Sequence, residues 1–164
     1  MVNNLINWKK ILLIDDDEIY LLMAELCLKD EYDIYKTKSG DEALKLLCKN
    51  DFIPDLIMLD ILMPKINGWE VFSKIKSISL LKDIPILFLT SLKGGKEKAQ
   101  ELGAVDYITK PFEMKSLKSR INEICNAKIT FVCDICTLRN DVEDDFNNLP
   151  FEYMCIKCGA RKSK

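Results

Sequence analysis

The chain contains no histidine among its 164 residues. This absence excludes a nucleophile activated by histidine, a histidine metal ligand and a role as a histidine phospho-carrier. The sequence also lacks an apolar run near the ~18 residues that a membrane span requires. Residues 1–5 lack the basic start and long apolar core of a secretion signal. We therefore expect a cytoplasmic protein with no membrane contact.

Neither sign of charge is in large excess. Lysine and arginine number 24 and aspartate and glutamate 26, which gives a net charge of -2. Such a chain offers no electrostatic reason to expect a nucleic-acid partner. The hydrophobic content of 48% and charged content of 30% are typical of a globular protein. The length corresponds to one ordinary domain with a smaller module beside it.

Five short segments with the character of β-strands alternate with five helical patterns over the first 126 residues. Continuous apolar runs are typical of interior strands, whereas an alternating run is typical of an edge strand. The alternation predicts an α/β fold built on a doubly wound, five-stranded parallel sheet. The predicted strands are 11–14, 32–38, 56–59, 86–89 and 105–108.

Two further expectations concern the packing of this domain. Apolar residues recur at helical spacing after the first strand, which predicts the inner face of the first helix. This stripe consists of Ile19, Leu22, Met23 and Leu26.

Three isolated cysteines lie among apolar neighbours in helical patterns, so we expect small core residues there. They are Cys27, Cys48 and Cys125.

Polar side chains follow four of the predicted strands. Asp15 and Asp16 follow the first strand, Asp60 the third, Thr90 the fourth and Lys110 the fifth. Because the carboxyl ends of parallel strands share one edge of the sheet, these side chains should surround a single crevice. Carboxylates repel one another by about 4 kcal/mol per pair at ~4 Å with an effective dielectric near 20. The crevice therefore needs bound protons or a cation, and Mg²⁺ suits a few hard oxygen ligands with room for water.

Phosphoryl transfer onto a carboxylate is the chemistry that uses these groups. Asp60 would be the nucleophile and the site of phosphorylation. Lys110 would neutralise charge on the phosphoryl oxygens, and the Thr90 hydroxyl would supply a hydrogen bond. The predicted magnesium ligands are Asp15, Asp16, Asp60 and the backbone carbonyl of Leu62.

Five separated motifs occur in one order: Asp15-Asp16, Asp60 followed by Met63-Pro64 and Gly68, Thr90-Ser91, Tyr107, and Lys110-Pro111-Phe112. In this pattern, residues 9–126 resemble the receiver domain of two-component response regulators. The resemblance implies the strand order 2-1-3-4-5 and a histidine kinase as phosphodonor. It also implies a cis bond before Pro111 and a conformational switch formed by Thr90 and Tyr107. A receiver that signals without phosphate is the remaining alternative for this part of the chain.

A different pattern occupies residues 129–164. Two C-x₂-C pairs are separated by 18 residues, with β-prone segments before each pair. So short a segment cannot bury enough apolar surface to fold alone, whereas four thiolates around Zn²⁺ would stabilise it. We predict a small β zinc ribbon with a structural site; two disulfides or a redox dithiol are the alternatives. The predicted zinc ligands are Cys133, Cys136, Cys155 and Cys158.

The predicted function is that of a response regulator without an enzymatic output. Phosphorylation would switch a zinc ribbon that contacts an unknown downstream protein, and a homodimer is possible. Residues 129–164 carry five basic and six acidic side chains, so nucleic acid is the weaker candidate partner. The alternative is a transcription regulator whose ribbon contacts nucleic acid or RNA polymerase. An aspartate-nucleophile phosphatase is disfavoured, because Leu62 occupies the position of its second acid.

Overall fold

The structure is a computed structural model that describes residues 8–49 and 52–126 and four short strands beyond them. The strands of the first part are β1 (Lys10–Ile14), β2 (Asp33–Thr37), β3 (Leu56–Leu59), β4 (Ile86–Thr90) and β5 (Asp106–Thr109). The helices are α1 (Glu18–Leu28), α2 (Gly40–Leu47), α3 (Gly68–Ser77), α4 (Lys96–Glu101) and α5 (Met114–Cys125). Strand and helix therefore alternate as the sequence predicts.

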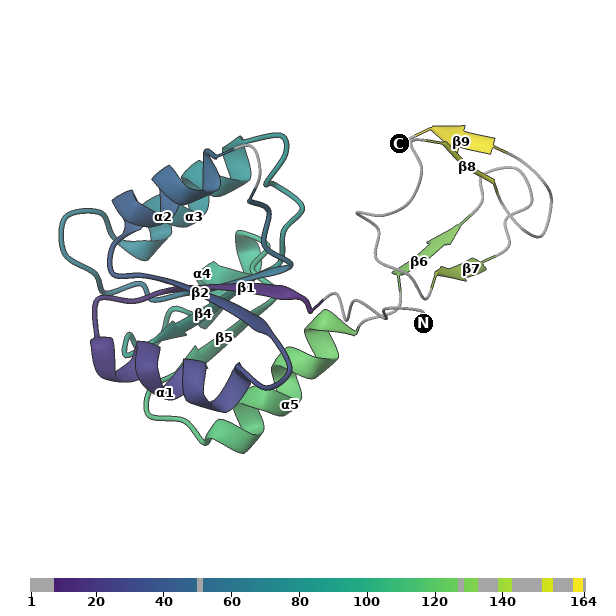
Figure 1. Ribbon diagram of the computed structural model, residues 1–164. Helices are drawn as coiled ribbons and strands as arrows, with labels where there is room; N and C mark the ends of the chain where they lie inside the picture. The colour runs from purple at the N-terminus through teal and green to yellow at the C-terminus, as the bar shows by residue number, and fades with distance from the viewer. Residues whose placement is uncertain are drawn as a thin grey trace. The chain divides into compact units, whose positions relative to one another are not determined.

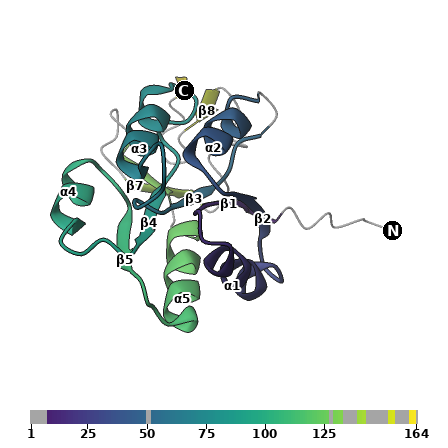
Figure 2. The ribbon, with the colours of Figure 1, turned by 90° about the vertical axis from the view of Figure 1, so that its left-hand side faces the viewer.

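All five strands pair in parallel in the order β2-β1-β3-β4-β5, which confirms the predicted sheet. The alternating strand β2 lies at one edge, and β5 lies at the other. Helices α1 and α5 cover one face of the sheet, and α2 and α3 cover the opposite face (Figures 1 and 2). Helix α4 lies beside β5. A sheet covered on both faces explains why its inner strands are apolar throughout.

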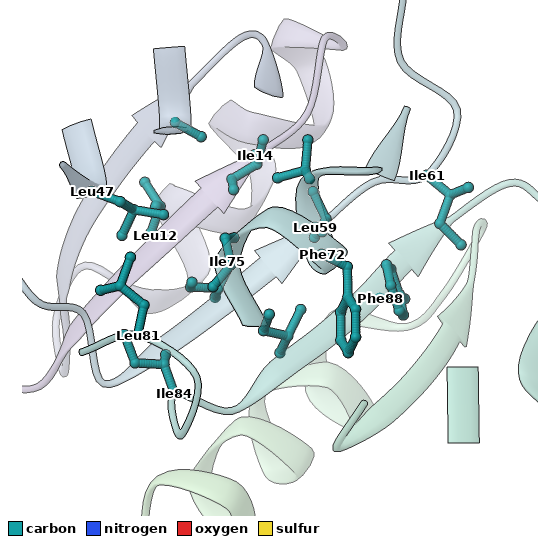
Figure 3. Packing of buried hydrophobic residues seen from close by; sticks show 14 of the residues in the cluster. Leu12, Ile14, Leu47, Leu59, Ile61, Phe72, Ile75, Leu81, Ile84 and Phe88 are labelled. Atoms are coloured by element: carbon teal, nitrogen blue, oxygen red, sulfur yellow. The ribbon is translucent and has the colours of Figure 1, made fainter. Parts of the chain in front are cut away.

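Successive residues of a strand point to opposite faces, so each inner strand contributes to two hydrophobic cores. In β1, Leu12 and Ile14 face the core under α2 and α3, where Phe72 of α3 stacks on Phe88 of β4 (Figure 3). The alternate residues of β1 face α1 and α5. Their core contains Ile11, Leu13, Leu21, Leu28, Leu87, Leu117 and Ile121.

Capping residues fix the ends of several helices and the loops beside them. The Asp17 side chain caps α1 by accepting a hydrogen bond from the Ile19 amide. Asn67 caps α3 by accepting from the Glu70 amide. Gly103 follows α4 with a φ of 84°, a left-handed conformation that glycine adopts without strain. These residues set where α1 and α3 begin and where α4 ends.

The structure corrects the predicted inner face of α1. Its buried residues are Leu21, Ala24 and Leu28, whereas the predicted stripe faces solvent. The exposed fractions are 68% for Ile19, 52% for Leu22, 44% for Met23 and 54% for Leu26. Apolar residues surround this helix, so spacing alone does not identify its buried side. Of the three cysteines predicted to lie in the core, Cys125 is buried, Cys27 is partly buried and Cys48, which directly follows α2, is exposed.

Residues 126–164 form a second compact unit. In it, β6 (Ile129–Val132) pairs antiparallel with β7 (Arg139–Val142), and β8 (Glu152–Met154) pairs antiparallel with β9 (Arg161–Ser163). The predicted zinc ligands Cys133, Cys136, Cys155 and Cys158 lie outside the described residues. In the described part of the chain, no helix is long and apolar enough to cross a membrane.

Candidate functional site at the carboxyl ends of the strands

The structure gathers the predicted site residues at one edge of the sheet. Asp15 directly follows β1, Asp60 follows β3 and Lys110 follows β5, while Thr90 is the last residue of β4. Asp15 and Asp60 are each 5% exposed, Lys110 is 7% exposed and Thr90 is fully buried. Asp16 is exposed at the mouth of the site. The parallel sheet brings these residues together because all its strands end on this side.

The three acidic side chains form a group that fits a divalent cation. Asp15, Asp16 and Asp60 each offer a carboxylate oxygen, and these atoms all lie within 4.8 Å of one another. If ionised, they carry three negative charges against the single positive charge of Lys110. Hard oxygen ligands with one open, exposed side match the coordination of Mg²⁺, which keeps several of its waters. The three carboxylates therefore have the ligand chemistry of a magnesium site.

Lys110 joins the two buried carboxylates. Its Nζ donates to Asp60 Oδ2 at 3.1 Å and also to Asp15 Oδ2. Burial acts to lower the pKa of Lys110, but the two carboxylates outweigh this effect and raise it. Burial raises the pKa of Asp15 despite its hydrogen bond with Lys110, and the Asp60 carboxylate adds to that rise. The lysine is thus held as a cation beside an excess of negative charge.

Backbone amides fix the two carboxylates from the loops that follow their strands. The amide of Leu62 donates to Asp60 Oδ1 at 3.1 Å, and the amide of Asp17 donates to Asp15 Oδ1 at 3.0 Å. The loop after Asp60 turns back tightly, and the Gly68 amide bonds to the Ile61 carbonyl at 2.9 Å. A Cβ at Gly68 would overlap the backbone of Asp60 and Ile61. Glycine is needed here for close approach rather than for an unusual backbone angle.

Thr90 and Tyr107, the predicted switch pair, lie on adjacent strands. Thr90 Oγ1 accepts a hydrogen bond from the Leu92 amide at 3.3 Å. The Tyr107 hydroxyl donates to the Leu92 carbonyl at 2.6 Å, and its ring is only 8% exposed, with its centroid 6.2 Å from that of Phe88. Both residues therefore contact one backbone segment, Leu92. Burial raises the pKa of Tyr107, which keeps its hydroxyl protonated as a donor.

Sequence reasoning missed two contacts of the site. Lys110 Nζ lies 4.1 Å from the ring centroid of Tyr20, an aromatic residue in the first turn of α1. Gly95, before α4, leaves room for Tyr107, because a Cβ there would lie 2.7 Å from the hydroxyl oxygen. Position in the first turn of α1 does not by itself indicate the first contact, since Ile19 in the same turn is 68% exposed. The Lys110–Pro111 peptide bond is cis, as expected.

Comparison with known proteins identifies the domain. Residues 11–122 match the family model of the response regulator receiver domain. The chain belongs to this family. The receiver is similar to the alkaline phosphatase synthesis transcriptional regulatory protein PhoP of Bacillus subtilis (strain 168), with 38% identity over 119 residues, covering 71% of this chain and 48% of that protein. It is also 39% identical over 115 residues to a probable cyclic di-GMP phosphodiesterase of Vibrio cholerae, covering 68% of this chain and 25% of that protein.

Solved receivers share the fold. A putative response regulator from Chloroflexus aurantiacus superposes with a TM-score of 0.67 and 35% identity, over 73% of this chain and 98% of the other. The response regulator TrrA of Thermotoga maritima, in complex with Mg²⁺ and a beryllium fluoride, gives a TM-score of 0.62 and 32% identity, over 71% of this chain and 98% of the other. The chain spans about half or less of the curated relatives named above. The chain thus contains a two-component receiver domain, with an acidic pocket of Asp15, Asp16 and Asp60.

Proposed function

We propose that Asp60 accepts a phosphoryl group from a histidine kinase in a reaction that requires Mg²⁺. One observation carries this proposal: the Asp60 carboxylate is fixed by the Leu62 amide and lies 3.1 Å from the Lys110 ammonium, beside two further carboxylates. Asp60 and Asp16 with Asp15 would hold the metal, together with the backbone carbonyl of Leu62. When bound, Mg²⁺ supplies positive charge to the phosphoryl oxygens.

Three residues of the chain have separate roles in the proposed phosphoryl transfer. One oxygen of Asp60 attacks phosphorus, so that an O–P bond forms while the P–N bond to the donor imidazole breaks and solvent protonates the departing nitrogen. Lys110, freed from one carboxylate, neutralises a phosphoryl oxygen. The Thr90 hydroxyl turns from the Leu92 amide toward another phosphoryl oxygen. No group of this chain must act as a general base, because an ionised carboxylate is already nucleophilic.

The switch follows from the shared contact at Leu92. Reorientation of Thr90 removes the acceptor of the Leu92 amide and alters the segment whose carbonyl holds Tyr107. The surface formed by α4 and β5 would then have two conformations, and the phosphoryl group would make different contacts in each. A difference of this kind is the condition for phosphorylation to shift the population from one conformation to the other. Thr90 and Tyr107 are the proposed switch residues.

The exposed apolar stripe of α1 is the proposed contact surface for the phosphodonor. Donor phosphorus must come within bonding distance of Asp60, so the donor has to cover the crevice and the element beside it. Helix α1 starts three residues after Asp15, and its outer side presents Ile19, Leu22, Met23 and Leu26. Four neighbouring apolar side chains in solvent are typical of a protein contact rather than of a free surface.

Labelling by a small-molecule phosphodonor tests the phosphorylation proposal. Wild type should incorporate phosphate from acetyl phosphate in Mg²⁺ buffer, lose it in excess chelator, and show no label after Asp60→Asn. Lys110→Ala, which keeps the acidic group, should bind Mg²⁺ but label more slowly. Equal labelling of wild type and Asp60→Asn would refute Asp60 as the acceptor.

For residues 129–164 we propose a zinc ribbon. Six residues separate β6 from β7, and six separate β8 from β9; both segments read C-x-x-C-x-x and are followed by an arginine. The two hairpins are thus a sequence repeat, with cysteines at the first and fourth positions of each connection. Paired C-x₂-C turns of this kind are a zinc pattern, and a tetrahedral four-thiolate site would be structural.

The proposed output is protein contact by this ribbon, under the control of the receiver; transcription regulation through nucleic acid is the second candidate. The similarity to a transcriptional regulatory protein favours the second candidate, whereas the balanced charge of residues 129–164 favours the first. Metal analysis should find about one zinc per chain, lost in a variant with Cys155→Ser and Cys158→Ser. A salt-dependent shift of DNA by the purified zinc-loaded protein would support transcription, and its absence at low salt would support protein contact.

A further inference from the structure

The ammonium group of Lys110 has an aromatic neighbour as well as its two carboxylates. Lys110 Nζ lies 4.1 Å from the ring centroid of Tyr20, inside the ~6 Å range of cation–π attraction. The ring also lines a small cavity beneath the strand ends together with Asp15 and Asp60. Tyr20 is therefore a component of the acidic site, although it comes from α1 and carries no charge.

Neighbouring elements hold the Tyr20 ring in this place. Its backbone is in the first turn of α1, which the Asp17 cap fixes directly beyond Asp15. On another side it meets Phe112, two residues after Lys110, with ring centroids 6.1 Å apart. Tyr20 is half-buried, and the Lys110 side chain is 3% exposed. The ring therefore helps to separate the ammonium from bulk water.

This contact matters because lysine is long and flexible. Its stem has many rotamers, and ordering it costs conformational entropy. When a cation binds the acidic group, Lys110 no longer has undivided use of the Asp15 and Asp60 oxygens. The face of the Tyr20 ring is a partner that the metal does not compete for, since its attraction comes from the ring quadrupole.

We propose that Tyr20 is a positioning residue for phosphoryl transfer, and this inference rests on the proposed phosphorylation of Asp60. The ring face keeps the Lys110 ammonium directed at Asp60 and screened from water while Mg²⁺ occupies the carboxylates. The ammonium is then already in place when the phosphoryl oxygens arrive. Tyr20 acts through Lys110 and does not touch the reacting atoms.

The alternative is that Tyr20 acts only as an apolar cover, which any apolar side chain could provide. Two substitutions distinguish this alternative from the positioning role. Tyr20→Phe keeps the ring face and removes the hydroxyl, whereas Tyr20→Leu keeps an apolar cover and removes the ring. We expect labelling by acetyl phosphate at saturating Mg²⁺ to be within twofold of wild type for Tyr20→Phe. For Tyr20→Leu we expect a rate about three- to tenfold lower, in line with the strength of such contacts.

Two readouts distinguish positioning from general damage to the fold. The apparent Mg²⁺ affinity should stay within about twofold of wild type in both variants, while the binding of beryllofluoride to Asp60, followed by NMR, should weaken only for Tyr20→Leu. Combined with Lys110→Met, Tyr20→Leu should have no further effect on that binding, because the partner of the ring is gone. Urea unfolding of each variant verifies that the protein is folded.

The outcomes separate this inference from the proposed function. If wild type is labelled and Tyr20→Leu matches it in rate and beryllofluoride binding, the positioning role is refuted and phosphorylation of Asp60 stands. An equal loss for Tyr20→Phe and Tyr20→Leu would also refute it, since the hydroxyl would then be the active group. If wild type is not labelled at all, the proposed function fails, and this inference fails with it.

Discussion

The Tyr107 hydroxyl donates a 2.6 Å hydrogen bond to the backbone carbonyl of Leu92. This bond ties β5 to the segment that follows β4, the same segment whose amide donates to Thr90. Two hydrogen bonds on either side of Leu92 thus link the Tyr107 hydroxyl to the Thr90 hydroxyl at the proposed site. It also makes the position of the Tyr107 ring sensitive to small changes in that segment.

Removal of this hydroxyl should destabilise the receiver slightly. Tyr107→Phe should lower the free energy of unfolding by about 1 kcal/mol, the usual value of one such bond. Gly95→Ala should also destabilise, because its Cβ would lie 2.7 Å from the hydroxyl oxygen. Urea unfolding of the two variants and their combination measures this coupling. If Gly95→Ala costs as much in the Tyr107→Phe background as in wild type, the hydroxyl is not what Gly95 accommodates.

Gly68 should not tolerate a side chain. In Gly68→Ala the new Cβ would lie 2.6 Å from the Ile61 Cα and would overlap the Asp60 carbonyl, and neither backbone atom can move without displacing Asp60. We expect a loss of about 2–3 kcal/mol in stability, together with slower labelling of Asp60. Gly40→Ala is the control for loss of stability alone, since its Cβ would clash with the buried Val71 side chain at 2.4 Å and not with the Asp60 backbone. Normal labelling of Gly68→Ala would contradict this reading of the loop.

The cysteines of the receiver should differ in reactivity. Burial raises the pKa of Cys125 to about 11, so at pH 8 only about one thiol in a thousand is ionised. Iodoacetamide should therefore modify the exposed Cys48 and spare Cys125, as read by peptide mass spectrometry. Because the folded-state pKa is raised, the contribution of Cys125 to stability is complete below pH 9 and declines as the pH rises toward 11. Equal modification of both residues in native protein would show that Cys125 is accessible.

Adjacent leucines of α1 should have opposite roles. Leu21→Ala should cost about 2–4 kcal/mol of stability, because Leu21 is 5% exposed in the core under α1. Leu22→Ala should change stability by less than about 0.5 kcal/mol, since Leu22 is 52% exposed. Conversely, Leu22→Ala should slow transfer from the kinase while labelling by acetyl phosphate is unchanged. The reverse pattern of stabilities would mean that the predicted stripe does face the core.

The sequence predicted the sheet and the gathering of the acidic residues for one physical reason. Parallel strands end on the same side, so polar residues that directly follow apolar runs must meet, as Asp15 and Asp60 do. Strand order was different: it came from the family resemblance, because apolar runs do not specify which strands are neighbours.

Other features of the fold and the site could not be predicted from the pattern of residues in the sequence. Helix α1 is apolar around most of its surface, so the stripe containing Leu22 was mistaken for its buried side. Tyr20 resembles any first-turn aromatic residue until the fold brings Lys110 to it from 90 residues away. Gly95 acquires its importance only from the inward position of Tyr107. Such contacts depend on which elements pack together, and local spacing does not encode that.

Localisation of the phosphoryl group tests the central claim most directly. Wild-type protein would be labelled in Mg²⁺ buffer, digested and analysed by mass spectrometry, with borohydride reduction to mark the acyl phosphate. The account predicts a single modified residue, Asp60, and no modification when Mg²⁺ is removed. A phosphoryl group on any other residue, or an unmodified Asp60 under these conditions, would contradict it.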